Sequence, residues 1–274
     1  MSSFDIEFAA VTDIGKIREK NEDNVLISSS LGLGVVADGM GGHSAGEVAS
    51  NIAVSVLAET IRKINEGQLK IPDTFLPKLA APERKMLMAA NLANAAIYST
   101  AQSSEIYRMM GTTMTGVLFD TDCATAVHVG DSRLYLFRDN QLVQITSDHS
   151  LAMEHVRRGL LTRAEAEHSK IQNVLTRAMG IKKNIEFDLL KFPVKIGDIM
   201  LLCSDGLYKG LSETDIATIL RDNINLSLVK LCKQLVQTSN EKDGQDNIST
   251  VLIKILPPHP VSFKQRIKSL FKRP

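Results

Sequence analysis

Three short acidic motifs, far apart in the chain, could together supply the ligands of a metal ion. They are ADGMGGH at residues 37–43, CSDG at 203–206 and GQDN at 244–247. Glycine carries no Cβ, so a carboxylate and a backbone carbonyl can approach one point beside it. A hard divalent cation such as Mg²⁺ or Mn²⁺ needs an oxygen-rich, uncrowded corner of this kind. The motifs therefore predict a metal site and, with it, phosphoryl chemistry.

Each motif taken alone also has a purely structural interpretation. Asp-Gly is foremost a turn dipeptide, and a single copy says little about function. Asp38, Asp205 and Asp246 nevertheless share a position, because each lies beside the end of an apolar run or just before one. The residues by themselves leave a set of turns and a divalent-metal site open as alternatives.

Two further segments could contribute to such a site. The segment GKIREKNEDN places Arg18 near Glu22 and Asp23. A guanidinium suits phosphate because it can bind two oxygens at once, although a solvated charged loop is the plainer interpretation. The segment VGDSR places Asp131 in a short link between two predicted strands. There it is either a turn residue or another carboxylate at the same sheet edge.

The spacing of apolar residues predicts the elements that position these motifs. Helices are expected over about 48–64, from Glu83 to about 101, from Ser212 through Leu220 and around 228–236, with a connection at 65–82. A capping-box match predicts a short helix from Thr162 within an exposed charged flap. Strands are expected at 6–10, 25–27, 33–37, 114–119, 124–129, 133–137, 142–145, from Val174, and at 185–191, 199–203 and 249–255.

The order of these elements indicates the fold class. It runs strands, two helices, many strands, two helices and a final strand, without the alternation of a parallel doubly wound fold. We therefore expect an α+β protein in which antiparallel sheets pack face to face and helix pairs cover the outside.

The composition is that of an ordinary globular protein of 274 residues, with 44% hydrophobic and 23% charged residues. A net charge of +1 argues against a nucleic-acid partner, since broad binding needs a strongly basic face. No window holds the about 18 apolar residues of a membrane span, and the first residues do not resemble a signal peptide. Cys123, Cys203 and Cys232 show no CxxC spacing, so we expect reduced thiols, no zinc site and a cytoplasmic protein.

Seven segments of the chain, in order, resemble those of bacterial metal-dependent protein phosphatases, the type 2C serine/threonine phosphatases. They are GKIREKNEDN, VVADGMGGHSAGEVAS, GTTMTGVLF, VHVGDSRLYLFRDNQLVQITSDHS, NVLTRAMG, LLCSDGLYKGLS and GQDNISTVLI. The resemblance implies a four-layer α/β/β/α sandwich of two antiparallel sheets flanked by helices, with two Mn²⁺ or Mg²⁺ ions at one end. It also implies a catalytic domain over residues 1–256, followed by a basic tail at 257–274.

The same resemblance implies a role for each metal-binding position. Asp38 is expected to bridge the two metals, and Gly39 to ligate one of them through its carbonyl. Asp205 and Asp246 are expected to hold the other metal. In bacterial members a third, weaker metal is held by the aspartates that match Asp131 and Asp205.

Further residues are implied around these metals. Glu22 and Asp23 are expected to orient metal-bound waters, Arg18 to bind the substrate phosphate and Asn247 to brace the loop of the last ligand. The implied reaction is attack by a metal-activated water on phosphoserine or phosphothreonine, without a covalent phosphoenzyme. The flap at 150–168 is expected to border the substrate cleft.

Two departures from the family pattern leave these ligands intact. Met40 stands where eukaryotic members often have a histidine proposed as general acid, and methionine cannot donate a proton. The group that protonates the leaving hydroxyl is therefore unassigned, and His43 is interpreted as structural. In the flap, His168-Ser169 replaces the His-Pro pair of many bacterial relatives.

We expect a phosphatase that acts on phosphorylated proteins and opposes a serine/threonine kinase. A phosphoprotein-binding module without turnover and a phosphatase of small phosphate esters are the alternatives. In the tail, apolar residues recur at helical spacing among five cations, at Phe263, Ile267, Leu270 and Phe271. That pattern is either a solvated basic end or an amphipathic helix that docks on anionic lipid or a partner.

Overall fold

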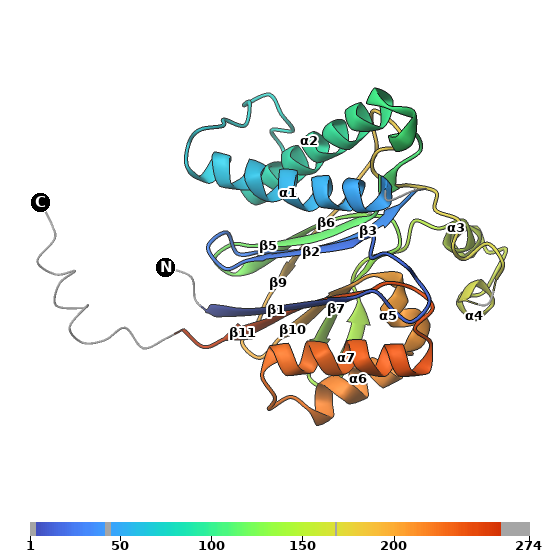
Figure 1. Cartoon of the computed structure of the whole chain (residues 1–274). Helices are drawn as coiled ribbons and strands as arrows, with labels where there is room; N and C mark the ends of the chain where they lie inside the picture. Colours follow the sequence, from blue (N-terminus) through green and yellow to red (C-terminus); the bar gives the residue numbers. More distant parts are fainter. Residues whose placement is uncertain (1–3, 42–44, 168, 259–274) are drawn as a thin grey trace, which may run out of the picture.

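Two antiparallel sheets pack face to face in the computed structural model, which describes residues 4–41, 45–167 and 169–258 (Figure 1). The first sheet has the strand order β1-β11-β10-β7-β8, and the second has β2-β3-β5-β6-β9 with β4 paired to β3. Helices cover the outer face of each sheet. The predicted four-layer α+β sandwich is confirmed.

The strands of the two sheets come from alternating parts of the chain. The first sheet contains β1 (Asp5–Asp13), β7 (Arg133–Arg138), β8 (Gln141–Gln144), β10 (Ile199–Cys203) and β11 (Ile248–Leu256). The second contains β2 (Asp23–Ser28), β3 (Leu33–Met40), β4 (Gly111–Thr112), β5 (Met114–Phe119), β6 (Cys123–Val129) and β9 (Asp188–Pro193).

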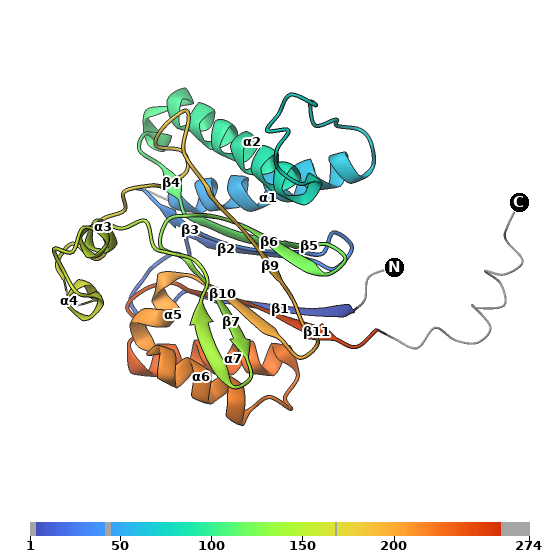
Figure 2. The ribbon, with the colours of Figure 1, turned by 180° about the vertical axis from the view of Figure 1, so that it is seen from behind.

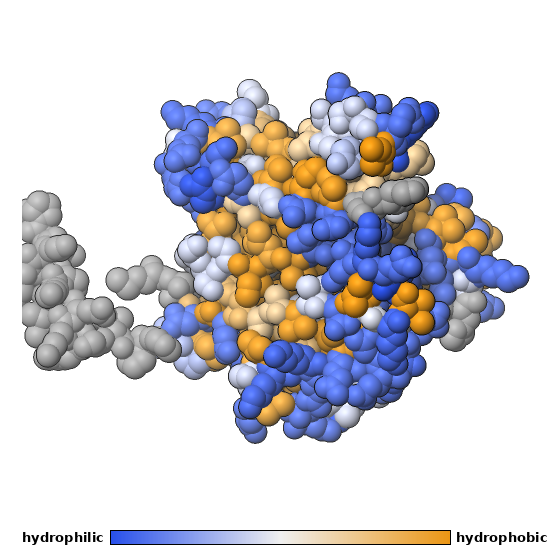
Figure 3. Space-filling model, viewed as in Figure 1, coloured by the Kyte–Doolittle hydropathy of each residue, from blue (hydrophilic) through white to orange (hydrophobic). Residues whose placement is uncertain are grey.

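The helices form the two outer layers and one projection. The second sheet is covered by α1 (Ala45–Asn65) and α2 (Ala81–Ser103), and the first by α5 (Asp205–Gly210), α6 (Glu213–Asp222) and α7 (Leu228–Lys242). The short helices α3 (Leu151–Arg157) and α4 (Arg163–Glu167) project beside one end of the sandwich in both views (Figure 2). Hydrophilic residues dominate the outer surface of the α6–α7 layer in Figure 3, as amphipathic helices require.

Three apolar layers hold the sandwich together because successive strand residues point to opposite faces. In β10, Leu201 packs with the α5–α7 helices, whereas Leu202 packs between the sheets. In β3, Val35 belongs to the core under α1 and α2, and Val36 to the core between the sheets. All of β10 and the first five residues of β3 are therefore apolar, as their sequence runs indicated, and both strands lead to the same edge.

The structure corrects several predicted elements. No strand begins at Val174; the neighbouring Leu175 forms one isolated bridge with Ser150. The strand expected from residue 185 begins later, as β9, because the segment before it lines a cleft instead of pairing. The helices α3 and α5 were not predicted, since they are too short to show a helical repeat.

Other boundaries agree closely with the sequence. The connection at 65–82 has no regular element between the end of α1 and the start of α2. The hairpin between β7 and β8 is tighter than expected, because only Asp139 and Asn140 form its turn, both with positive φ (52° and 61°). His43, His168 and residues 259–274 of the predicted tail lie outside the described residues. Within the described ranges, no helix is long and apolar enough to cross a bilayer.

Candidate active site

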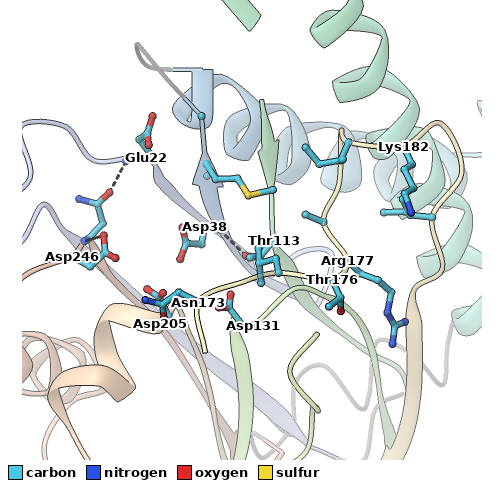
Figure 4. Close-up of a pocket in the computed structure, with 18 of the residues that line it drawn as sticks. Glu22, Asp38, Thr113, Asp131, Asn173, Thr176, Arg177, Lys182, Asp205 and Asp246 are labelled. Atoms are coloured by element: carbon cyan, nitrogen blue, oxygen red, sulfur yellow. Dashed lines mark hydrogen bonds between the residues drawn. The ribbon is translucent and has the colours of Figure 1, made fainter. Parts of the chain in front are cut away.

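The acidic residues marked by the sequence meet in one cleft at the end of the sandwich (Figure 4). The cavity has a volume of about 680 Å³. Asp23 lies directly opposite Asp38 in the β2–β3 pairing. The other predicted site residues all line the cavity: Arg18, Glu22, Asp38, Gly39, Asp131, Asp205, Asp246 and Asn247.

Asp38 is carried to the cleft by the buried strand β3 and is braced through its backbone. Its N–H donates to Thr113 Oγ1 and its carbonyl accepts from Thr112 Oγ1, both at 2.9 Å. Among the described residues, no hydrogen bond or ion pair occupies its carboxylate oxygens. The backbone is thus fixed while the carboxylate remains available to a ligand.

Gly39 allows two other segments to close on Asp38. A Cβ at this position would collide with the carbonyl oxygens of Gly46 and Glu22, so only glycine fits. The Gly39 N–H donates to the Glu22 carbonyl at 3.2 Å, and Ser50 Oγ donates to the same carbonyl at 2.6 Å. The backbone N–H of Gly46, in the first turn of α1, donates to the Glu22 carboxylate. Glu22 is therefore held beside Gly39.

Asp23 links both sheets beneath the cleft. Ser204 Oγ donates to Asp23 Oδ2 at 2.7 Å and accepts the Ser249 N–H at 2.9 Å. Burial raises the pKa of Asp23 to about 7, although these serines favour the charged form.

Asp205 and Asp131 each follow the end of a strand, one in each sheet. Asp205 is the first residue of α5, directly after β10, and the Gly206 that follows lies against the Asn247 carbonyl with no room for a Cβ. Asp131 occupies the link between β6 and β7, where its carbonyl accepts the Tyr208 hydroxyl at 3.1 Å. Both aspartates are buried.

Asp246 and Arg18 form the more open side of the cleft. Arg18 Nη2 lies 2.8 Å from Asp246 Oδ1, and the Arg18 side chain is 52% exposed. Asn247 joins this side to the rest of the site: its Oδ1 accepts the Glu22 N–H at 2.9 Å, and its Nδ2 donates to the Ile14 and Lys20 carbonyls. Asn247 therefore ties the loop of Asp246 to the segment that carries Arg18 and Glu22.

Each carboxylate in this cleft disfavours the ionised form of its neighbours. Burial, and then the nearby Asp23 and Asp205, hold the pKa of Asp38 well above its usual range. Burial followed by the charge of Asp205 raises the pKa of Asp131 to about 8. Burial also raises the pKa of Asp205, an effect that Lys209 partly offsets. A cation placed among these groups would relieve the repulsion.

The donor set fits a hard divalent cation. Asp205 Oδ1 is buried and has no hydrogen-bond partner among the described residues, which is unusual for a charged oxygen. In the part of the chain that the structure describes, no three histidine, cysteine, aspartate or glutamate side chains form a metal-binding group by themselves. Backbone carbonyl and water oxygens would have to complete the coordination, as is common for Mg²⁺.

The opposite wall of the cleft comes from residues 173–186, which the sequence did not assign to the site. Thr176, Arg177 and Lys182 lie across the cavity from the acidic side (Figure 4). The described part of the predicted flap at 150–168 supplies none of the lining residues. The sequence also missed Thr113, Ser204 and Lys209 as contacts of the aspartates; they lie inside the family-like segments, but no spacing rule marks them.

Comparison with known proteins then decides the family. The sequence profile described as "Protein phosphatase 2C" matches residues 19–253, most of the chain. The chain belongs to the protein phosphatase 2C family.

Relatives of this phosphatase include curated proteins and solved structures. It is 34% identical over 250 residues to the serine/threonine phosphatase stp of Listeria welshimeri, covering 89% of this chain and 93% of the relative. The crystal structure of the Mycobacterium tuberculosis serine/threonine phosphatase PstP/Ppp is similar at a TM-score of 0.79, with 31% identity and coverage of 92% and 99%. A structure of the PstP catalytic domain in complex with two manganese ions matches at a TM-score of 0.77, with the same identity and coverage.

This protein phosphatase 2C is a metal-dependent serine/threonine protein phosphatase, and its substrates are phosphoproteins. The predicted family, fold and reaction class are confirmed.

Proposed function

We propose that the phosphatase hydrolyses phosphoserine and phosphothreonine in cytoplasmic bacterial proteins and so opposes a serine/threonine kinase. The observation that carries the proposal is the convergence of Asp38, Asp131, Asp205 and Asp246 beside Arg18 in one cleft. The free cysteines agree with a reducing compartment. In this proposal residues 1–256 form the catalytic unit.

The acidic side of the cleft would hold two Mn²⁺ or Mg²⁺ ions. Asp38 would bridge them, the Gly39 carbonyl would serve one, and Asp205 and Asp246 the other. A third ion would be shared by Asp131 and Asp205. Such ions supply an activated water and positive charge for phosphoryl transfer. The unpaired oxygens of Asp38 and Asp205 support this assignment.

The chain's own residues perform the remaining tasks. Glu22 and Asp23 stand beside the proposed ligands, where their carboxylates can accept hydrogen bonds from waters. Arg18, half exposed and paired only at the rim, can turn from Asp246 to the substrate phosphate. The Asn247 side chain keeps Arg18 and Asp246 in register through its hydrogen bonds to the backbone of Glu22 and Ile14.

The wall opposite the carboxylates fits the protein chain around the phosphorylated residue. Lys182 would face acidic or backbone groups of the substrate, beside Arg177 and its ion pair with Asp188, while Ile181 and Ile185 add apolar surface. A small phosphate ester would leave this half of the cleft unused.

The test is hydrolysis of a phosphothreonine peptide by the full chain with Mn²⁺, with Mg²⁺ and with excess EDTA. We expect phosphate release with a divalent metal and none with EDTA. The Arg18→Ala variant should raise KM several-fold, because one charge-assisted contact to phosphate is lost. Equal hydrolysis of small phosphate esters and phosphopeptides, measured as kcat/KM, would contradict the protein substrate. An unchanged kcat and KM in Arg18→Ala would remove Arg18 from the site.

A further inference from the structure

Lys209 brings a positive charge from the protein itself into the cluster of carboxylates. It lies one turn after Asp205 on α5, and its Nζ contacts Asp205 Oδ2. The same Nζ is 3.6 Å from Asp246 Oδ2. Only 26% of the side chain is exposed. Lys209 therefore sits between two proposed metal ligands and lines the cleft with them.

The surroundings keep this ammonium charged. A lysine side chain is charged at neutral pH, and the contacts of Lys209 with Asp205 and Asp246 favour that charge. Its contact uses one oxygen of Asp205, while the other oxygen is buried and has no partner among the residues that the structure describes. The ion pair thus satisfies only part of the carboxylate.

We propose that Lys209 is a built-in cation that competes with divalent metal ions for Asp205 and Asp246, and so sets the metal concentration at which the phosphatase is loaded. The proposal rests on the metal assignment given above. A carboxylate oxygen in contact with an ammonium cannot simultaneously give its full charge to a metal ion. Metal binding must therefore displace Lys209 or act against its positive charge, and either cost is subtracted from the affinity for the metal.

The same competition has a second consequence in the metal-free protein. There Lys209 offsets the mutual repulsion of the buried aspartates. Removing its charge should weaken the metal-free fold and strengthen metal binding at once. A residue with a purely structural role would change only the first of these.

The experiment is calorimetric titration of Mn²⁺ into the metal-free full chain, together with thermal unfolding of the metal-free protein. We compare the wild type with Lys209→Met, Lys209→Gln and Lys209→Arg. Lys230→Met, at an exposed position of α7, serves as the matched control for loss of one positive charge. Lys209→Gln keeps a polar side chain, in case the methionine variant does not fold.

We expect Lys209→Met and Lys209→Gln to bind Mn²⁺ about tenfold more tightly, because a like charge a few ångströms from the metal is removed. Their metal-free melting temperatures should be lower than that of the wild type. Lys209→Arg should retain an affinity close to that of the wild type, and Lys230→Met should change neither quantity.

Equal or weaker Mn²⁺ binding by both neutral variants would overturn the proposal. A rise in KM for the phosphopeptide with no change in Mn²⁺ affinity would likewise overturn it, and would make Lys209 a phosphate-binding residue. Asp205→Asn separates this failure from failure of the metal assignment. If Asp205→Asn binds Mn²⁺ as the wild type does, the assignment itself is wrong.

Discussion

Two aspartates, Asp38 and Asp198, stand at opposite ends of the same sandwich, and their surroundings differ completely. At the cleft end, Asp38 has no partner for its carboxylate among the described residues. At the other end, before β10, Asp198 accepts hydrogen bonds from Arg138 Nε (2.8 Å), Arg138 Nη2 (2.6 Å) and the Lys195 N–H (2.7 Å). Asp198 is only 2% exposed and is buried more deeply than Asp38, which is partly exposed.

The difference teaches what each carboxylate is for. A buried charge is costly unless it is paired and hydrogen-bonded, and Asp198 meets both conditions within the chain. Asp38 meets neither, and its neighbours Asp23 and Asp205 increase the cost. The fold accepts this cost where a ligand from outside can supply the missing charge. The cleft end is therefore built for binding, and the far end for stability.

The largest effect should follow from neutralising Asp38, the aspartate at the cleft end. Asp38→Asn should reduce kcat at least about 1,000-fold, since loss of a bridging ligand removes several kcal/mol of charge stabilisation from the reaction. The melting temperature of the metal-free protein should stay the same or rise, because one repelling carboxylate is removed. Phosphopeptide turnover with Mn²⁺ and a thermal scan without metal measure the two effects. Activity close to that of the wild type would show that the Asp38 carboxylate does not serve a ligand.

Neutralising Asp198 at the other end should reduce stability and leave kcat unchanged. Asp198→Asn should lower the free energy of unfolding by about 2–3 kcal/mol, because the variant loses the charge of the ion pair and its amide nitrogen cannot accept a hydrogen bond from Arg138. Urea unfolding measures this loss. The kcat of the folded variant should be unchanged, since Asp198 is at the far end of β10 from Asp205. A loss of kcat without a loss of stability would show that the two ends are not separate.

The sequence predicted the aspartates of the cleft but not the residues that brace them, and the reason is distance along the chain. Asp38, Asp205 and Asp246 stand in local motifs at strand ends, so neighbouring residues marked them. The groups that brace them come from elsewhere: Thr113 is 75 residues from Asp38, and Ser204 is 181 residues from Asp23. Such contacts depend on which strands pair, and a single sequence does not give strand order.

The wall of the cleft was missed for a related reason. An apolar pair at Val174 and Leu175 was interpreted as a strand, because a short apolar run cannot be assigned by periodicity alone. In the structure Leu175 makes one bridge with Ser150 and lines the cavity, whereas Val174 does not line it. The four-layer fold was predictable because long β-strands and helices repeat their pattern, whereas this irregular wall has no pattern to repeat.

The buried histidine His128 shows whether a buried polar atom without a hydrogen-bond partner is enough to indicate a ligand-binding site. His128 on β6 is fully buried; its Nδ1 lies 2.9 Å from Thr115 Oγ1, and its Nε2 has no partner among the described residues. The ring of His149 lies 4.7 Å away, and beyond it Asp188 pairs with Arg177. The ordinary pKa of a histidine already leaves it mostly neutral at pH 7, so this buried pair needs no ligand to balance a charge.

That difference predicts a pH dependence. Burial, and then the neighbouring His149, lower the pKa of His128 to about 3. The unfolded chain therefore binds the proton first as pH falls below about 6.5, and stability is lost on acidification through that window. Between pH 7 and pH 5 the wild type should lose about 2 kcal/mol more unfolding free energy than His128→Gln, at 1.36 kcal/mol per pKa unit. Urea unfolding at both pH values measures this, with His155→Gln as the control for loss of a histidine outside the pair. Equal losses of unfolding free energy in the wild type and His128→Gln would show that His128 is not held neutral in the folded protein. A buried, charged His128 without a hydrogen-bond partner would then need a ligand, as the cleft aspartates do.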